Sequence, residues 1–378
     1  MKAKIEIIFV VFFISLIFLP YLFAHRTKEE RVSDMENRML SEYPSLFVDN
    51  SININYLSEF EDWLQDNLRG RTLFVEFYST MQYQFFERIV KDNVIQGKNG
   101  WLFSRDEILE YQHLNLLEQD ELDLYVQNMQ KLSDYLKKKE IAFYYMQCYD
   151  KAIVYPEEYA EGIQQVGDIS RADQIISALQ DKTDIRLIPI KETLQRMVNQ
   201  EIYYKYVDLT HWNERGAYWG YHCLMEEIKK DFPQVQVLEE NDYEIEEVLG
   251  DTYLYGFRYP LTESFPVYKK KVENAEEITE RTMNRWDFLH YKEHTHDYEN
   301  ISSQNDLKIL LVGDSFIRQF IKDDIAESFS CTLSIDWMNI MILDEVVEEY
   351  KPDIVVLECA QFPLDAVIPL IEGMDFVE

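Results

Sequence analysis

The stretch "KILLVGDSF", residues 308–316, decides the fold. Four apolar residues follow Lys308, which is the pattern of a buried strand, and Gly313 permits a sharp turn directly after it. Asp314 and Ser315 then stand where a helix begins. A buried strand that leads through a tight turn into a helix is typical of an α/β sheet, whose ligands bind at the carboxyl ends of the strands.

Further strands and helices alternate along the rest of the chain. Other strand-like runs are "IAFYYMQC" (141–148), "IRLIPI" (185–190), "TLSIDW" (332–337) and "DIVVLECA" (353–360). Helical spacing of apolar residues extends over 122–136, 191–200, 214–232, about 316–329 and 341–350. This alternation predicts an α/β fold with a mostly parallel sheet and helices on both faces.

We expect this α/β domain to span residues 56–378. It opens with a helix from Tyr56 that ends near "DNLRGR", where Gly70 suits a left-handed cap, and a second, aromatic helix follows over 72–90. Asn99-Gly100 predicts a tight hairpin turn. A polar and acidic segment around 238–305 is expected to be an irregular insertion or lid.

The N-terminus carries the pattern of a membrane anchor. Lys2 and Lys4 precede 18 uncharged residues, "IIFVVFFISLIFLPYLFA" at 7–24. At about 1.5 Å per residue this run is just long enough to cross a bilayer. We expect residues 1–25 to form a cytoplasmic tip and transmembrane signal anchor, and 26–55 a stalk that leads to an extracytoplasmic domain. A cleaved signal peptide and a buried core helix are the alternatives.

Composition narrows the possible partners. The 378 residues are 47% hydrophobic and 14% aromatic, which is ample for a folded core. The formal net charge is −33, whereas a protein that binds DNA or RNA needs clustered cations. The sequence therefore argues against nucleic acid as a partner.

Cysteine and histidine give weak signals. The four cysteines at 148, 223, 331 and 359 form no C-x-x-C pair, so we expect buried free thiols, with a disulfide as the alternative in an oxidising compartment. His290, His294 and His296 lie together among acids. The stretch lacks cysteine partners and convincing ligand spacing for zinc, so a solvated loop is favoured and we expect no metal and no cofactor.

The position of Ser315 admits two interpretations. A serine at a helix N-terminus lies among backbone N–H groups that have no partner inside the helix. Those donors can stabilise the oxyanion of a tetrahedral intermediate if the serine is a nucleophile. In the alternative, Asp314 and Ser315 only cap the helix.

A second block, "YVDLTHWNERGAYWGY" at 206–221, supplies the groups that such a serine needs. A serine hydroxyl requires a general base, for which histidine is suited, and the imidazole requires a carboxylate to fix its tautomer. Asp208 precedes His211 by three residues, close enough for the carboxylate to fold back onto the ring. The alternative is a helix cap from Thr210 or Asn213, with His211 merely exposed.

Together the two blocks resemble a known family. "GDSF" is similar to the serine block of SGNH-type esterases and acyltransferases, and D-x-x-H to their Asp/His block. The Asp/His block precedes the serine here, followed by "HWNERGA". That circularly permuted order resembles the AlgX/AlgJ-like (DHHW) family of SGNH-hydrolase-like polysaccharide O-acetyltransferases.

Other motifs extend the resemblance over roughly residues 30–365. They are "ENRML" with "YPSL", "WLQDNLRGR", "GKNGWLF", "DKAIVYPEEY" and "YKPDIVVLECAQ". Two features depart from the family pattern. Two residues, not one, separate Asp208 from His211, and Gln361 stands where arginine is common.

The resemblance implies roles for individual residues. Ser315 is the nucleophile, His211 the general base and Asp208 the group that orients it. Lys151, Tyr155 and Trp212 are expected to line the substrate cleft; the alternatives are a surface charge for Lys151 and core packing for the two aromatic residues.

The resemblance also implies a function and partners. We expect a membrane-anchored O-acyltransferase that moves an acetyl group to a cell-surface or exported polysaccharide, with a membrane-bound MBOAT-type acyltransferase as partner. Two other functions remain open: an SGNH-type carbohydrate esterase, and an assembly or glycan-binding subunit with an idle site.

Overall fold

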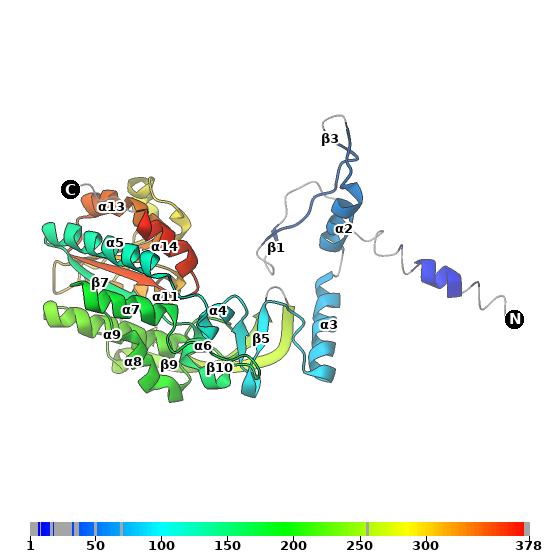
Figure 1. The fold of residues 1–378 in the computed structure, drawn as a ribbon, viewed down its shortest axis with the longest axis horizontal. Coiled ribbons are helices and arrows are strands. Elements are labelled where there is room, and N and C mark those ends of the chain that lie inside the picture. Colours follow the sequence, from blue (N-terminus) through cyan, green and yellow to red (C-terminus); the bar gives the residue numbers. More distant parts are fainter. Residues whose placement is uncertain are drawn as a thin grey trace. The chain divides into compact units, whose positions relative to one another are not determined.

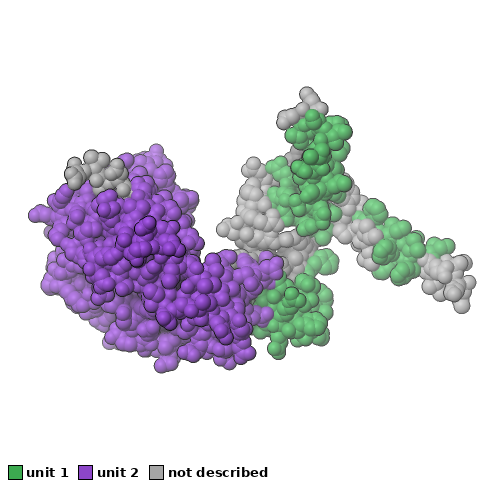
Figure 2. All heavy atoms as spheres, in the orientation of Figure 1, with its two compact units in different colours: residues 1–90, 251–262 green, residues 91–250, 263–378 purple. Residues whose placement is uncertain are grey.

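The chain folds into two compact units. The computed structural model describes residues 7, 9–15, 18, 32–33, 38–48, 51–68, 71–254 and 257–373. One unit comprises residues 1–90 and 251–262, and the other residues 91–250 and 263–378 (Figure 2). The second unit contains the α/β domain.

A seven-stranded sheet forms the centre of the second unit. In spatial order its strands are β11 (Glu276–Glu277), β12 (His296–Glu299), β14 (Cys331–Asp336), β13 (Lys308–Gly313), β15 (Ile354–Cys359), β7 (Ala142–Gln147) and β8 (Arg186–Leu187). The five strands from β14 to β8 are parallel, and β12 joins β14 antiparallel. In the register, Leu311 lies between Ser334 and Val356. The predicted mostly parallel sheet is confirmed.

Helices cover both faces of this sheet (Figure 1). Side chains of α5 (Gln119–Lys138), α13 (Leu343–Tyr350) and α14 (Leu364–Glu372) pack on one face with Leu310 and Val312. Those of α8 (Ile190–Met197), α9 (Glu214–Asp231), α11 (Ser315–Phe320) and α12 (Lys322–Ala326) pack on the other with Ile309 and Leu311. Successive residues of a strand point to opposite faces, so one apolar run supplies two cores. Among the described residues, the other α-helices of this unit are α4 (Ile108–Gln112), α6 (Lys151–Val154), α7 (Arg171–Lys182) and α10 (Thr279–Thr282).

Two hairpins lie outside the main sheet. β5 (Val94–Gln96) pairs antiparallel with β6 (Leu102–Ser104) around Asn99 and Gly100, whose φ angles of 52° and 83° are left-handed. This is the predicted turn. β9 (Tyr243–Leu254) pairs with β10 (Phe257–Lys270). The expectation of an irregular segment over 238–305 is wrong in this respect, because that segment forms a long ribbon and then adds β11 and β12 to the sheet.

The described residues of the first unit include two short strand pairs and two helices. Their bounds are β1 (Val32–Ser33), β2 (Arg38–Met39), β3 (Phe47–Val48), β4 (Ser51–Ile52), α2 (Tyr56–Asn67) and α3 (Arg71–Phe86). Half of the predicted anchor at 7–24 lies outside the described residues, as does Gly70. Within the described part of the chain, no helix combines the length and apolar character that a membrane crossing requires.

The start of α9 packs closely against the backbone of Ile202 and against Trp212. A Cβ atom at Gly216 would overlap the backbone carbonyl of Ile202 and would lie 2.8 Å from the Cβ of Trp212. Neither neighbour is the flexible end of a side chain. Glycine is therefore required here for close approach of two backbone segments.

We predict that Gly216→Ala destabilises the protein by about 1–3 kcal/mol, because overpacking forces backbone shifts. Urea unfolding monitored by circular dichroism measures the change. Gly373→Ala is the matched control, since its Cβ would meet only ordinary contacts at 3.4 Å or more. Equal stability of the Gly216→Ala protein and the wild type would contradict the packing argument.

Candidate active site

Two loops meet at the carboxyl end of the parallel strands. Ser315 follows β13 and opens α11, and its neighbour Asp314 is the helix cap, with Oδ1 accepting from the Phe316 amide at 2.9 Å. Oδ2 of Asp314 accepts from the Ala360 amide at 2.8 Å. Asp314 thus caps the helix and also ties the serine turn to the segment after β15.

The second loop brings Asp208 and His211 to the serine. Nε2 of His211 lies 2.7 Å from Ser315 Oγ, and its Nδ1 lies 2.9 Å from Asp208 Oδ2. The amides of Thr210 and His211 each donate to Asp208 Oδ1 at 2.7 Å. A carboxylate only accepts, so Nδ1 carries the proton and Nε2 is left to accept from the serine hydroxyl. The three side chains form one chain of hydrogen bonds.

Burial and hydrogen bonds shift the pKa of Asp208 in opposite directions. Burial alone would raise its pKa, but the hydrogen bonds and charge of His211 hold the pKa well below its usual range. The carboxylate is therefore ionised at neutral pH. The ring of His211 lies against Phe316 and Phe320, with centroid distances of 4.9 and 5.6 Å, and these aromatic neighbours restrict its orientation.

The alternative interpretations of these motifs also describe part of the structure. Asn213 caps α9 and accepts from the amides of Arg215 and Gly216, while Asp314 caps α11. Capping fixes where each helix begins, so it sets the positions of the residues beside it. Capping and the Ser315–His211 contact therefore occur together.

Lys151, Tyr155 and Trp212 occupy the interior and not an open cleft. Their exposed fractions are 0%, 7% and 0%. The hydroxyl of Tyr155 donates to the carbonyl of Val198 at 2.9 Å, and the ring of Trp212 lies 4.9 Å from that of Phe316. Their surfaces face protein atoms, which differs from the expected role in lining the cleft. Core packing, the alternative for the two aromatic residues, agrees with this placement.

The three neighbouring histidines have protein partners. Nδ1 of His294 lies 2.8 Å from Asp336 and Nδ1 of His296 lies 2.8 Å from Glu277, while the His290 amide donates to Asn339. Among the residues that the structure describes, no cluster of three His, Cys, Asp or Glu residues could hold a metal ion. All four cysteines are free thiols, and three of them are buried.

A buried glutamate lies behind the serine turn. Oε2 of Glu358, in β15, accepts from the Asp314 amide at 3.0 Å, and a Cβ at Gly313 would lie 2.7 Å from the same oxygen. Burial raises the pKa of Glu358 well above its usual range, and the charge of Asp314 raises it further. Burial likewise raises the pKa of Asp314, against the amide hydrogen bonds that lower it. The sequence carried a signal for this group, since Glu358 interrupts the apolar run "IVVLEC".

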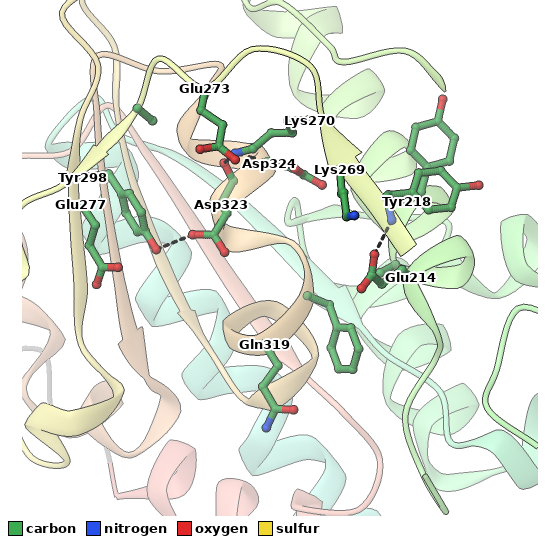
Figure 3. A pocket seen from close by; sticks show the side chains of 14 residues that line it. Glu214, Tyr218, Lys269, Lys270, Glu273, Glu277, Tyr298, Gln319, Asp323 and Asp324 are labelled. Atoms are coloured by element: carbon green, nitrogen blue, oxygen red, sulfur yellow. Dashed lines mark hydrogen bonds and ion pairs between the residues drawn. The ribbon is translucent and has the colours of Figure 1, made fainter. Parts of the chain in front are cut away.

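A cavity of about 490 Å³ lies beside this site. Figure 3 shows the side chains that line this cavity. Phe320 lines the cavity and also contacts the His211 ring. The rings of Tyr218 and Tyr268, on α9 and β10, stack at 5.5 Å along another side. The charged residues of its lining are Glu214, Lys269, Lys270, Glu273, Glu277, Asp323 and Asp324. The sequence did not indicate this cavity, because β10, β12 and α12 meet only in the fold.

A comparison with known protein families shows which family the chain belongs to. Residues 94–322, more than half of the chain, match the family described as "SGNH hydrolase-like domain, acetyltransferase AlgX". The chain belongs to this acetyltransferase family. The AlgX-family match includes both loops of the site. The predicted family and enzyme class are therefore confirmed at the level of the family. A comparison with curated proteins finds no match.

Solved structures share the SGNH-like fold. Bacillus cereus PatB1 is 17% identical over 72% of this chain and 97% of that chain, with a TM-score of 0.54. A DHHW family protein from Eubacterium siraeum is 16% identical over 77% of this chain and 98% of that chain, with a TM-score of 0.53. These identities are low, so the two likenesses concern the fold alone.

The raised pKa of Glu358 predicts a pH dependence of stability. A carboxyl that holds its proton more tightly when folded stabilises the protein at low pH and loses that contribution as pH rises through the folded pKa. We predict that wild type loses stability between pH 6 and 8.5 and that Glu358→Gln loses less, by up to about 1.4 kcal/mol per pH unit. Urea unfolding at both pH values measures this.

Glu345→Gln serves as the control for this experiment, because Glu345 is an exposed acid on α13. Its pH dependence is expected to follow that of wild type. Parallel loss of stability in wild type and Glu358→Gln would show that Glu358 is not the group that keeps its proton.

Proposed function

We propose that this protein is a membrane-anchored, extracytoplasmic O-acyltransferase that moves an acetyl group to hydroxyls of a cell-surface or exported polysaccharide. Ser315, His211 and Asp208 carry the reaction. The continuous hydrogen-bond chain among these three side chains is the observation that supports the proposal most directly. Membership of the acetyltransferase AlgX family supports the choice of acyl transfer.

The reaction proceeds in two half-reactions. Ser315 Oγ attacks the acyl carbonyl of the donor as His211 Nε2 removes its proton, and the imidazolium returns that proton to the leaving group. His211 then removes the proton of an acceptor hydroxyl, which attacks the acyl-enzyme and frees Ser315. Ionised Asp208 stabilises the imidazolium in both steps, and the Ser315 amide is one donor to the oxyanion.

The proposed location follows from the N-terminal sequence. Residues 7–24 would anchor the chain, and residues 26–55 would separate the catalytic domain from the bilayer. An acyl donor made inside the cell must then cross the membrane to reach Ser315. A membrane-bound MBOAT-type acyltransferase is the partner we propose for that step, by analogy with the family.

The cavity next to His211 is the place we propose for the acceptor glycan. Its stacked tyrosines offer apolar ring faces, and its carboxylates accept hydrogen bonds from sugar hydroxyls. Lys269 and Lys270 are paired with Glu246 and Glu327, at 2.5 and 3.1 Å. The lining has five acidic residues and two lysines, and burial raises the pKa of one acid, Asp324, to about 7. The remaining carboxylates would repel a polyuronate.

We predict that Ser315→Ala reduces acyl-enzyme formation by at least about 10³-fold, because the oxygen nucleophile is removed. The full chain in detergent is mixed with p-nitrophenyl acetate, and nitrophenol release and the acetylated serine are measured. Acetylated oligosaccharide in the presence of an acceptor indicates transfer, and acetate alone indicates an esterase. Undiminished release by Ser315→Ala would refute the catalytic role of this serine.

The charge of the cavity predicts selectivity among acceptors. We expect neutral N-acetylglucosamine oligomers to be acetylated at least about tenfold faster than mannuronate oligomers at low salt, with a smaller gap at high salt. The double variant Glu273→Gln/Glu277→Gln should narrow the gap. Asp344→Asn/Glu345→Gln on α13 is the matched control. Equal rates for both glycans, or a gap that the cavity variant leaves unchanged, would place the acceptor elsewhere.

A further inference from the structure

The loop that carries Asp208 is held by a buried lysine. Nζ of Lys151, in α6, donates to the backbone carbonyls of Tyr204 at 2.9 Å and Asp208 at 2.6 Å. The lysine side chain is fully buried. One ammonium group thus fixes both ends of the segment 204–208, and its second contact is to the residue whose carboxylate meets His211.

Glu263 holds the same loop through its amide groups, as an acceptor of hydrogen bonds. Its carboxylate accepts from the consecutive amides of Lys205, Tyr206 and Val207, at 2.5, 2.9 and 3.1 Å. Glu263 belongs to β10 and is 9% exposed. Lysine holds the carbonyls and glutamate holds the amides, so the backbone of this loop is bonded on both sides.

Glu107 holds the remaining part of the loop. The hydroxyl of Thr210 donates to its carboxylate, while the amide of Thr210 donates to Asp208 Oδ1 at 2.7 Å. Thr210 therefore connects Glu107 with the acid of the proposed triad. Glu107 lies just before α4 and is also buried. The three ionisable groups come from separate parts of the fold and converge on residues 204–210.

Stability alone does not account for these buried ionisable groups. Burial raises the pKa of Glu107 to about 8 and lowers that of Lys151 to about 8, which records the cost of keeping either group charged in the interior. Apolar residues of similar volume are often as stable as a buried ion pair. What an apolar group cannot do is hold a backbone carbonyl or amide in one place.

We propose that Lys151, Glu263 and Glu107 are positioning residues of the acyl-transfer site. They fix the backbone of 204–210 so that Asp208 meets Nδ1 of His211 while Nε2 reaches Ser315. This inference rests on the proposed function, since it needs a catalytic role for Asp208. It also gives Lys151 a role other than contact with substrate.

Lys151→Met tests the proposal through a double-mutant cycle with Asp208→Ala. A misplacement of about 1 Å can cost up to about 10²-fold in rate. We therefore expect Lys151→Met to lower kcat for p-nitrophenyl acetate by about 10- to 100-fold, with KM changed less than about twofold. In the Asp208→Ala background the same substitution should change kcat by less than about twofold, because the group it positions is gone.

Glu263→Gln provides a second, milder variant should Lys151→Met fail to fold, since glutamine keeps the shape of the side chain. It replaces one acceptor oxygen by an N–H donor that faces the loop amides, so kcat should fall and KM should hold. Lys191→Met is the matched control, because this partly buried lysine bonds both carboxylate oxygens of Asp173 at 2.6 Å. Its kcat should equal that of wild type. Thermal unfolding verifies that each variant is folded.

The outcomes separate the two proposals. An equal loss from Lys151→Met with and without Asp208, or wild-type kcat in both Lys151→Met and Glu263→Gln, would overturn the positioning role. If Ser315→Ala is inactive in the same experiment, the proposed function still stands. Full activity of Ser315→Ala would instead remove the proposed function, whatever the result of the cycle.

Discussion

The hydrogen bond between His211 Nε2 and Ser315 Oγ depends on more of the fold than any other contact in the site. It joins side chains 104 positions apart in the sequence. The parallel strands bring both loops to the same end of the sheet, and Asp314 ties the serine turn to the segment after β15. The donor–acceptor distance of a hydrogen bond can vary by only a few tenths of an ångström. The sheet register and the helix caps must therefore both place the two loops correctly.

Buried polar groups hold the two loops in these positions, and their burial costs desolvation energy. Glu358 and Asp314 lie behind the serine, and Lys151, Glu107 and Glu263 surround the Asp208 loop. Each is poorly exposed, and most of their hydrogen bonds go to backbone groups. Loops lack the hydrogen-bond ladder of a helix or strand, so side chains from neighbouring elements satisfy their amides and carbonyls. In this protein the same bonds also hold the backbone that carries Asp208, His211 and Ser315.

The acidic character of the chain has a local consequence beside this site. The chain has a formal net charge of −33, and acidic residues also line the cavity beside His211. Phe320 lines this cavity and contacts the His211 ring. Carboxylates there accept hydrogen bonds from hydroxyls and repel anions, while the stacked Tyr218 and Tyr268 present apolar faces. The chain belongs to an acetyltransferase family. We propose that the electrostatics of this cavity favour acceptor glycans without acidic groups.

The sequence by itself determined the strand–turn–helix at Ser315, the alternation that gives an α/β sheet, the Asn99-Gly100 turn and the pairing of Asp208 with His211. These features depend on neighbours within a few residues, where periodicity and turn chemistry act. Only the tertiary structure decided that Lys151 is buried, that residues 243–270 form a ribbon, and that Glu107 and Glu263 bond the Asp208 loop. Those contacts join distant segments, so their partners are chosen by packing and by the need to satisfy buried polar groups, which local sequence does not record.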